Sequence, residues 1–537
     1  MSWQIGDFVG YEGKPHKETN MQNNIPAILL KAIGFASNNW PWLGRKINKI
    51  AINKSVNVCR HRPHPWSMVH DYVSWTSLTD QLWSARHLPA KRLTPPKNDN
   101  LENFFKRQNQ RLSSKSTCLF PAFAQYLTDG FIRTRMPQKG EPDDPARKQN
   151  TSNHQLDLSP LYGRTPEQTA VLRLLSEKRG ERGRLKSQEI NDEEYAPFLF
   201  DGNEIKAEFT ILDLPLMSDS FKGNEDIISK IFAVGGDRVN ASPQVAMINT
   251  LFLREHNRLA GIIETANTGW YDERVFQVAR NITIVLFLKI VVEEYINHIS
   301  PSIKFIADPS VAWNAPWNKP NWLTTEFSLL YRWHQLIPDV MKWGGEDYPV
   351  AATIMNNKIL LNVGLKKAFV DMSDQHAGEI GAFNTAASLL HLEKMAIDQG
   401  RLCQLASYSD YREYVSLKRP KRFSEVSANP DVVRFLESAY QSVDDIEFYV
   451  GLFAEDIDNN SPLPPLLRTM VAVDAFSQAL TNPLLSEHVW KEETFTEAGW
   501  KVINETRNLR DILHRNVIGG LNGDVFIGIT HHDWKPN

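Results

Sequence analysis

The chain has 537 residues, a formal net charge of −3, 42% hydrophobic residues and 10% aromatic residues. This length and apolar content allow a sizeable buried core, and the balanced charge without a long basic run excludes nucleic acid as an expected partner. The three cysteines, Cys59, Cys118 and Cys403, are too few and odd in number for a disulfide framework.

The N-terminal region contains two short apolar clusters interrupted by proline and asparagine. Their members are Ile25, Ile28, Leu29, Leu30, Ile33 and Phe35, then Trp40, Trp42, Leu43, Ile47, Ile50 and Ile52. Tryptophan beside basic residues on short amphipathic helices suits contact with one membrane leaflet, and packing on the main domain is the alternative. We predict an arm and a monotopic membrane-binding segment over residues 1–66, and one large domain over residues 67–537.

No signal peptide is predicted, because the first residues lack a charged stretch followed by an apolar core. No transmembrane helix is predicted either, since the run FLKIVVEEYINHI contains two glutamates and a lysine and is typical of a buried helix. The expected location is intracellular, either cytoplasmic or peripheral to a membrane.

Helical periodicity dominates the rest of the chain. The pattern predicts helix throughout 244–300, and strand signals are confined to short pieces near 197–212 and 350–363. Polar stretches at 135–152 and 173–195 are typical of loops. We therefore predict a mainly α fold.

The segment EFSLLYRWHQLIPD (326–339) carries the chemistry of greatest interest. Tyr331 and His334 are three residues apart in an apolar run without proline, a spacing that predicts one face of a helix. Imidazole can ligate haem iron and a phenol can carry an oxidising equivalent. Core packing is the alternative interpretation of such a pair.

Tyr331, Trp333 and His334 resemble the Y-x-W-H haem-ligand segment of the cyclooxygenases (prostaglandin H synthases), within the animal-type haem peroxidase superfamily. Similar strings run in order through residues 71–515: DYVSWTSLTDQLWSARHLP (71–89), FAQYLTDGFIRT (123–134), NHQLDLSPLYG (153–163), TLFLREHNRLA (250–260) and DDIEFYVGLFAED (444–456). The resemblance implies a large helical catalytic domain without the family's epidermal-growth-factor-like module. It leaves a homodimer open, because family members are often dimers.

The resemblance assigns His334 as the proximal iron ligand and Tyr331 as the radical carrier. Tyr295 matches a tyrosine that hydrogen-bonds the radical tyrosine. The remaining residues implied for the apolar surroundings and the substrate channel are Phe327, Leu330, Trp333, Ile296, Ile299 and Ser477.

The expected distal side departs from the family pattern. Gln125 matches, but Asp129 stands where the Q-x-x-x-H pattern has histidine. An ordinary aspartate is ionised near neutrality and is a poor proton donor to a hydroperoxide, so weak or absent peroxidase turnover is predicted. Arg238 aligns with an arginine that polarises peroxide in some relatives. Alternatively, Asp129 pairs with Arg133, one helical turn away.

Cofactor and substrate expectations follow from the same resemblance. Thr128 and Ala241 stand where relatives have the carboxylates esterified to haem, so haem b is expected without a covalent bond. Calcium is not expected: Asp157 and Ser159 match a calcium loop, but Gly130 replaces its helix-borne aspartate. The arginine that pairs with the fatty-acid carboxylate has no direct counterpart. The nearby basic residues are Lys54, Arg60 and Arg62.

These observations predict a haem-dependent dioxygenase. It would use a tyrosyl radical to abstract hydrogen from an unsaturated fatty acid, and O2 would add to give a lipid hydroperoxide. The alternatives are a haem peroxidase that uses the distal carboxylate and Arg238, a prostaglandin-forming cyclooxygenase, and an inert lipid- or haem-binding relative.

Overall fold

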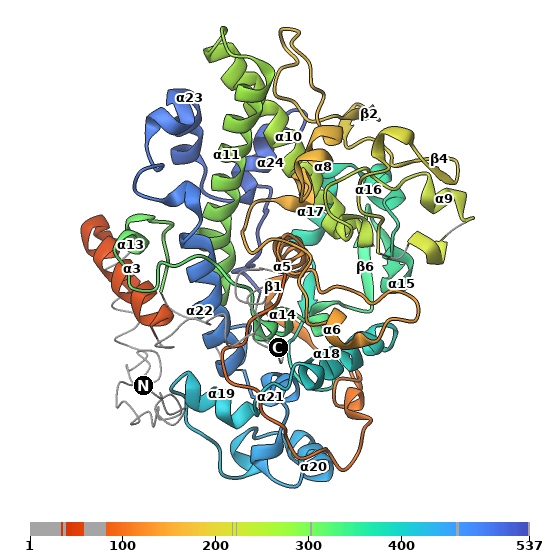
Figure 1. Cartoon of the computed structure of the whole chain (residues 1–537), viewed down its shortest axis with the longest axis vertical. Coiled ribbons are helices and arrows are strands. Elements are labelled where there is room, and N and C mark those ends of the chain that lie inside the picture. Colours follow the sequence, from red (N-terminus) through yellow and green to blue (C-terminus); the bar gives the residue numbers. More distant parts are fainter. Residues whose placement is uncertain are drawn as a thin grey trace, which may run out of the picture.

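The computed structural model describes residues 34–35, 39–57, 82–216, 218–221, 223–300, 303–457 and 461–534. Arg60, Arg62 and most of the first apolar cluster lie outside these residues. Within them the architecture is mainly α, as predicted, and the strands form short antiparallel pairs (Figure 1).

Two long helices form the centre of the molecule. Helix α10 (Pro243–Ala266) and helix α11 (Asp272–Ile290) pack against each other, and α5 (Leu119–Asp129), α23 (Glu492–Glu505) and α24 (Leu509–Asn516) contact this pair (Figure 1). Helix α11 continues through a π-helical turn (Val291–Ile296) into α12 (Asn297–Ile299). The predicted helical region at 244–300 is therefore confirmed, with a short interruption between α10 and α11.

The stretch Asp272–Ile299 is the one helix of the described residues that is long and apolar enough to cross a membrane. However, 72% of its most apolar window is buried inside the protein. Such burial is typical of a core helix, because a membrane-spanning helix of a single chain presents more of its surface to lipid.

The lower half of the molecule in Figure 1 is built around helices that come late in the chain. Helix α14 (Thr325–Leu330) packs against α22 (Pro465–Leu480), α18 (Leu390–Leu402) and α21 (Phe448–Ala454). The remaining helices are α6 (Asp143–Ala146), α7 (Ser159–Tyr162), α8 (Pro166–Leu172), α9 (Glu225–Ile228), α13 (Ser310–Trp313), α15 (Val350–Thr353), α16 (Lys358–Val363), α17 (Leu365–Ser373), α19 (Tyr408–Tyr414) and α20 (Pro430–Ala439).

The strand predictions are partly right. Strands β4 (Phe200–Asp201) and β5 (Glu204–Ile205) fall within the predicted region at 197–212. The region 350–363 is helical instead, and the hairpin of β6 (Val340–Trp343) and β7 (Glu346–Pro349) precedes it. Two adjacent glycines with positive φ form its turn, which suits a hairpin that twists in the right-handed sense.

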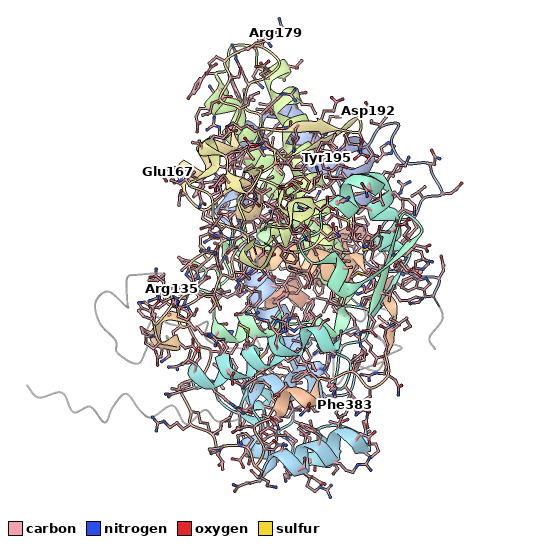
Figure 2. All side chains as sticks on the ribbon, turned by 90° about the vertical axis from the view of Figure 1, so that its right-hand side faces the viewer. Arg135, Glu167, Arg179, Asp192, Tyr195 and Phe383 are labelled. Atoms are coloured by element: carbon pink, nitrogen blue, oxygen red, sulfur yellow. The ribbon has the colours of Figure 1, made fainter. Side chains whose placement is uncertain are left out.

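The other strands join segments that are both near and far in sequence. Strand β1 (Leu112–Thr117) pairs with β8 (His376–Gly378) beside α5. Strand β2 (Gln188–Ile190) pairs with β3 (Glu193–Tyr195), and Figure 2 shows Asp192 and Tyr195 close together on this hairpin.

Helix α3 (Pro41–Val56) lies at the edge of the molecule beside α13 and packs against α22 (Figure 1). Its inner side buries Ile52, and Asn48 exchanges hydrogen bonds of 3.1 and 3.0 Å with the backbone of Ile306. Its outer side exposes Trp40, Trp42 and Ile50. The second apolar cluster therefore both packs on the main domain and presents large apolar side chains to the surroundings.

Candidate active site

The Tyr331–His334 segment is not one continuous helix, so that prediction was wrong. The Thr324 hydroxyl caps the start of α14 by accepting from the Phe327 amide at 3.0 Å, but helical geometry stops at Leu330. Tyr331 is the capping residue and His334 begins a separate 3₁₀ turn, His334–Leu336. A Cβ at Gly378 would collide with the carbonyl of Gln335, so this glycine allows β8 to approach the turn closely.

Aromatic rings enclose Tyr331. Its ring centroid lies 4.8 Å from that of Phe327 and 4.9 Å from that of Trp333, which it stacks on. Trp333 also stacks on Phe120 of α5 at 5.4 Å and on Tyr295 at 6.5 Å. The segment thus packs Tyr331 and Trp333 together with α5 and the π-helical turn. An enclosure of this kind excludes water from the phenol.

The Tyr331 hydroxyl is buried and has no hydrogen-bond partner among the described residues, and the same holds for Tyr295. Burial raises the pKa of both phenols, and each phenol shifts the pKa of the other, which places the two hydroxyls near one another. Tyr331 is therefore neutral at physiological pH and has no strong hydrogen bond that would need to break before its hydrogen atom is lost.

His334 faces a buried carboxylate. Its Nδ1 lies 3.1 Å from Oε1 of Glu393 on α18, a hydrogen-bonding separation although the N–H is not aligned with it. The His334 side chain is 17% exposed, whereas the Glu393 side chain is fully buried. His334 Nε2 makes no hydrogen bond within the described part of the chain, so it remains available as a metal ligand. We call the Tyr331–His334 segment with Glu393 the proximal side.

The opposite, distal side is formed by Gln125 and Asp129 on α5 and by Arg238. The predicted pairing of Asp129 with Arg133 is wrong, because Arg133 binds Asp237 at 2.9 Å instead. Asp129 lies 3.9 Å from the Arg238 guanidinium, and its Oδ2 is buried without a partner. Arg238 donates to the carbonyl of Ile132 at 2.6 Å.

The distal carboxyl differs from an ordinary aspartate. Burial raises the pKa of Asp129 from 3.8 to about 7; the charges of Arg238, Arg164 and Arg332 counter this rise, and Asp237 adds to it. This contradicts the assumption that Asp129 is ionised near neutrality. At about pH 7 the group is divided between carboxylate and acid, and can both accept and donate a proton.

Arg332 links the two sides electrostatically. Its charge acts on the pKa of Asp129, and in turn the pKa of Arg332 is lowered by burial and by Arg238, while Tyr449 and Glu393 raise it. These residues therefore surround one region between α5 and the His334 turn. An accessible imidazole nitrogen on one side and an unpartnered buried carboxyl oxygen on the other fit a haem between them.

The predicted channel residues are all buried. Phe327 and Leu330 lie on α14, Ile296 ends the π-helical turn, and Ile299 ends α12. The Ser477 hydroxyl on α22 donates to the carbonyl of Asp474 at 3.0 Å.

An unexpected buried polar pair lies near Tyr331. His87 Nε2 lies 3.0 Å from Asp474, both side chains are at most 5% exposed, and the charge of Asp474 acts on the pKa of Tyr331. The surroundings of Tyr331 are therefore not purely apolar, in contrast to the apolar channel that the sequence predicts.

Two further groups come from the sequence analysis. Lys54 is exposed in the last turn of α3. In the loop that matches the calcium loop of relatives, Ser159 donates to the carbonyl of Gly130 at 2.7 Å, next to Asp129. Asp157 accepts from Ser159 N at 3.0 Å and from the Asn153 side-chain amide at 2.7 Å, so protein donors already engage both of its oxygens.

Sequence reasoning missed Glu393, Tyr449 and the His87–Asp474 pair. One signal was readable: Glu393 stands three and four residues before Ala396 and Ile397, which places an acid on the apolar face of α18. The other residues contact the centre from distant parts of the chain, and their local sequence gives no signal.

Residues 108–522 match the family described as animal haem peroxidase. The chain belongs to the animal haem peroxidase family. Prostaglandin G/H synthase 2 from Equus caballus is 30% identical over 521 residues, covering 93% of this chain and 81% of that protein. The predicted resemblance to the cyclooxygenase-like group of this family is confirmed.

Solved structures share the fold of this family member. Fatty acid alpha-dioxygenase from Oryza sativa superposes with a TM-score of 0.66 and 16% identity, covering 91% of this chain and 94% of that one. Peroxidase A from Dictyostelium discoideum superposes with a TM-score of 0.62 and 19% identity, covering 87% and 100%. At these identities the likeness confirms the predicted helical haem-peroxidase fold.

Proposed function

We propose that this chain is a haem-dependent dioxygenase that converts an unsaturated fatty acid to a lipid hydroperoxide through a radical on Tyr331. The observation that carries the proposal is the buried Tyr331 hydroxyl, without a hydrogen-bond partner, enclosed by aromatic rings three residues before His334. The names of similar proteins, prostaglandin G/H synthase and fatty acid alpha-dioxygenase, support this chemistry.

The bound haem would be held by His334 and would supply the oxidising equivalent that removes an electron from Tyr331. Thr128 and Ala241 offer no carboxylate for an ester bond, so we propose that haem b is bound non-covalently and is extracted by acidified organic solvent. With both Asp157 oxygens engaged by protein donors, the proposed enzyme does not use calcium.

Tyr331 then does the chemistry on the substrate. Its phenoxyl radical takes a hydrogen atom from the weak C–H bond between two double bonds, which leaves a carbon radical and a neutral phenol. Dioxygen adds to the carbon radical, and the resulting peroxyl radical takes the hydrogen back from Tyr331. One hydroperoxide forms from one fatty acid and one O2, and the tyrosyl radical is restored. The surrounding rings of Phe327 and Trp333 protect it from water.

The decisive experiment measures oxygen uptake and identifies products by mass spectrometry with a panel of unsaturated fatty acids. Tyr331→Phe should lower uptake by roughly a thousandfold or more with haem absorbance unchanged, since removal of a reacting group has effects of this size. Tyr126→Phe is a matched control, because this buried tyrosine of α5 donates to Asn249 of α10 at 3.1 Å. Unchanged uptake in Tyr331→Phe would reject the proposal, and endoperoxide products would favour a prostaglandin-forming cyclooxygenase.

A specific observation favours a second function, a haem peroxidase. The raised pKa of Asp129 and the nearby Arg238 provide a proton acceptor, a proton donor and a cation at the distal side. We still propose that peroxidase turnover is weak, because an aspartate side chain is shorter than the family's histidine and Asp129 is drawn toward Arg238. Rapid peroxide-dependent oxidation of guaiacol would favour the peroxidase instead.

We further propose that residues 1–66 include a segment that contacts one membrane leaflet. Trp42 is 63% exposed and Ile50 57% exposed on the outer side of α3, and Lys54 on the same helix is positioned to meet lipid headgroups or a substrate carboxylate. Ile50→Ala should weaken binding to anionic vesicles by about tenfold through lost apolar burial. Ile518→Ala, at a residue 73% exposed elsewhere, is the matched control, and equal effects would contradict the proposal.

A further inference from the structure

Glu393 is a fully buried carboxylate with neutral donors on nearly every side. Its Oε2 accepts a hydrogen bond of 2.5 Å from Tyr449. Its Oε1 accepts from Thr385 at 2.7 Å and from the Gln335 amide at 3.4 Å, and lies 3.1 Å from His334 Nδ1. Within the described residues no lysine or arginine lies at salt-bridge distance from it.

This arrangement determines which nitrogen of His334 carries the proton. A carboxylate accepts hydrogen bonds but cannot donate them, so the nitrogen that faces it must be the N–H. His334 Nδ1 has no other acceptor in the described residues, and burying an imidazole N–H without an acceptor is unfavourable. The tautomer with hydrogen on Nδ1 leaves the lone pair on Nε2.

We propose that Glu393 is a positioning residue for His334: it fixes the Nδ1–H tautomer, directs Nε2 toward the haem iron and makes the imidazole a stronger electron donor. The inference rests on the proposed haem ligation by His334. A negatively charged partner withdraws the Nδ1 proton more strongly than a neutral one would, and a partner of this kind tunes the metal through its ligand. Tyr449 and Thr385 moderate this effect, because their hydrogen bonds spread the charge of the carboxylate.

The network predicts a change of one sign in Glu393→Gln and of the opposite sign in two other variants. Glu393→Gln keeps the size but removes the charge, so it should weaken the iron–imidazole bond. Tyr449→Phe and Thr385→Val remove donors from the carboxylate, so they should leave more charge facing His334 and strengthen that bond. A merely structural role for the network would move all three variants in the same direction or leave the bond unchanged.

The measurement is the iron–histidine stretching frequency of the ferrous haem-loaded protein by resonance Raman spectroscopy, with the haem reduction potential recorded in parallel. We expect Glu393→Gln to lower the frequency, raise the potential and weaken haem binding by about 10–100-fold. Tyr449→Phe and Thr385→Val should raise the frequency and lower the potential. Should Glu393→Gln fail to fold, these two variants test the inference alone.

Glu326→Gln provides the matched control. Glu326 is also fully buried and accepts a 2.5 Å hydrogen bond from a tyrosine, Tyr411, but it accepts its other hydrogen bond from the backbone amide of His87. Its substitution should leave the stretching frequency unchanged. An equal shift in Glu326→Gln and Glu393→Gln, or an unshifted frequency in the Glu393, Tyr449 and Thr385 variants, would overturn the inference. Absence of any iron–histidine band in the unmodified protein would instead overturn the proposed haem ligation itself.

Discussion

The proximal and distal sides of the site are built differently. On the proximal side, Tyr331, Trp333 and His334 come from one short segment, and stacked rings and the Glu393 carboxylate hold them. On the distal side, Asp129 and Arg238 come from separate segments and lie 3.9 Å apart, with one carboxyl oxygen unpartnered. The proximal side is organised by many short contacts, whereas the distal side depends on one loosely held acid.

This difference separates two kinds of chemistry. Holding a metal ligand and shielding a radical require fixed geometry, which the proximal contacts provide. Cleaving a peroxide requires a group that both accepts and donates a proton, and at the distal side burial, countered mainly by the charge of Arg238, sets the pKa of Asp129 for that task. A substitution on one side can therefore reduce one activity and spare the other, so substitutions can separate radical oxygenation from peroxide cleavage.

The largest expected effect is on the proximal side. His334→Ala should reduce haem affinity by more than about a hundredfold, because loss of a supporting partner alone reduces metal affinity by about 10–100-fold. Haem titration followed by absorbance measures this. His391→Ala, at an exposed position on the helix that carries Glu393, should leave affinity unchanged. Retention of the same haem spectrum in His334→Ala would show that the iron ligand lies elsewhere.

The next effect tests the distal side. Asp129→His should raise peroxide-dependent guaiacol oxidation by about a hundredfold, and Asp129→Asn should lower it by a similar factor, since a positioned acid–base group contributes on this scale. Oxygen uptake with fatty acid should change far less once the radical has formed. Asp157→Asn, at a half-buried acid, is the control. If neither substitution at Asp129 alters peroxidase activity, this carboxyl does not face the haem.

Protein stability should depend on pH through the same distal group. A carboxyl whose pKa rises from 3.8 to about 7 on folding holds its proton more tightly in the folded state, so it destabilises the fold increasingly as pH rises between those values. Between about pH 5 and pH 8.5 the stabilising effect of Asp129→Asn should grow by about 3 kcal/mol. Denaturant unfolding at both pH values measures this.

Asp410 supplies a control of opposite sign. Burial alone would raise the pKa of Asp410. Hydrogen bonds from Lys91, Ser407 and Arg419 outweigh that effect, so its pKa is lowered. Such a group stabilises the fold above its unfolded pKa, and is charged at both test pH values. Asp410→Asn should therefore destabilise the protein equally at both. A gain for Asp129→Asn that does not change with pH would contradict the raised pKa.

The two sides also differ in how far the sequence predicts them. The closeness of Tyr331 and His334 was predictable, because the Y-x-W-H string keeps them within four consecutive residues. The helix expected there was wrong because the apolar run does not show where the backbone leaves helical geometry; Trp333 has φ −96° and ψ 50°. Glu393 lies far along the chain, so only folding reveals its contact.

The sequence predicts which residue replaces the distal histidine, but it does not predict the pKa of that residue. The replacement of histidine by Asp129 is visible in the sequence, yet its pKa depends on burial and on Arg238 and Arg332, which are distant in sequence. The pairing expected with Arg133 followed helix spacing, but α5 ends at Asp129, so Arg133 is no longer one helical turn away. The mainly α fold and the helical region at 244–300 were predictable, because apolar periodicity indicates them.

The smallest expected effect concerns Tyr295, which contacts both the proximal side and helix α5 of the distal side. Tyr295 stacks on Trp333, its ring packs at a tilt against Phe123 of α5, and its hydroxyl lies near Tyr331. Because Tyr295→Phe removes one neutral polar group beside Tyr331, an effect of about 0.5–1.5 kcal/mol, it should slow oxygenation by about 2–10-fold without loss of haem. Oxygen uptake and the electron paramagnetic resonance spectrum of the tyrosyl radical measure this, with Tyr126→Phe as control. An effect as large as that of Tyr331→Phe would mean that the radical is shared by both phenols, and that the proximal segment alone does not hold it.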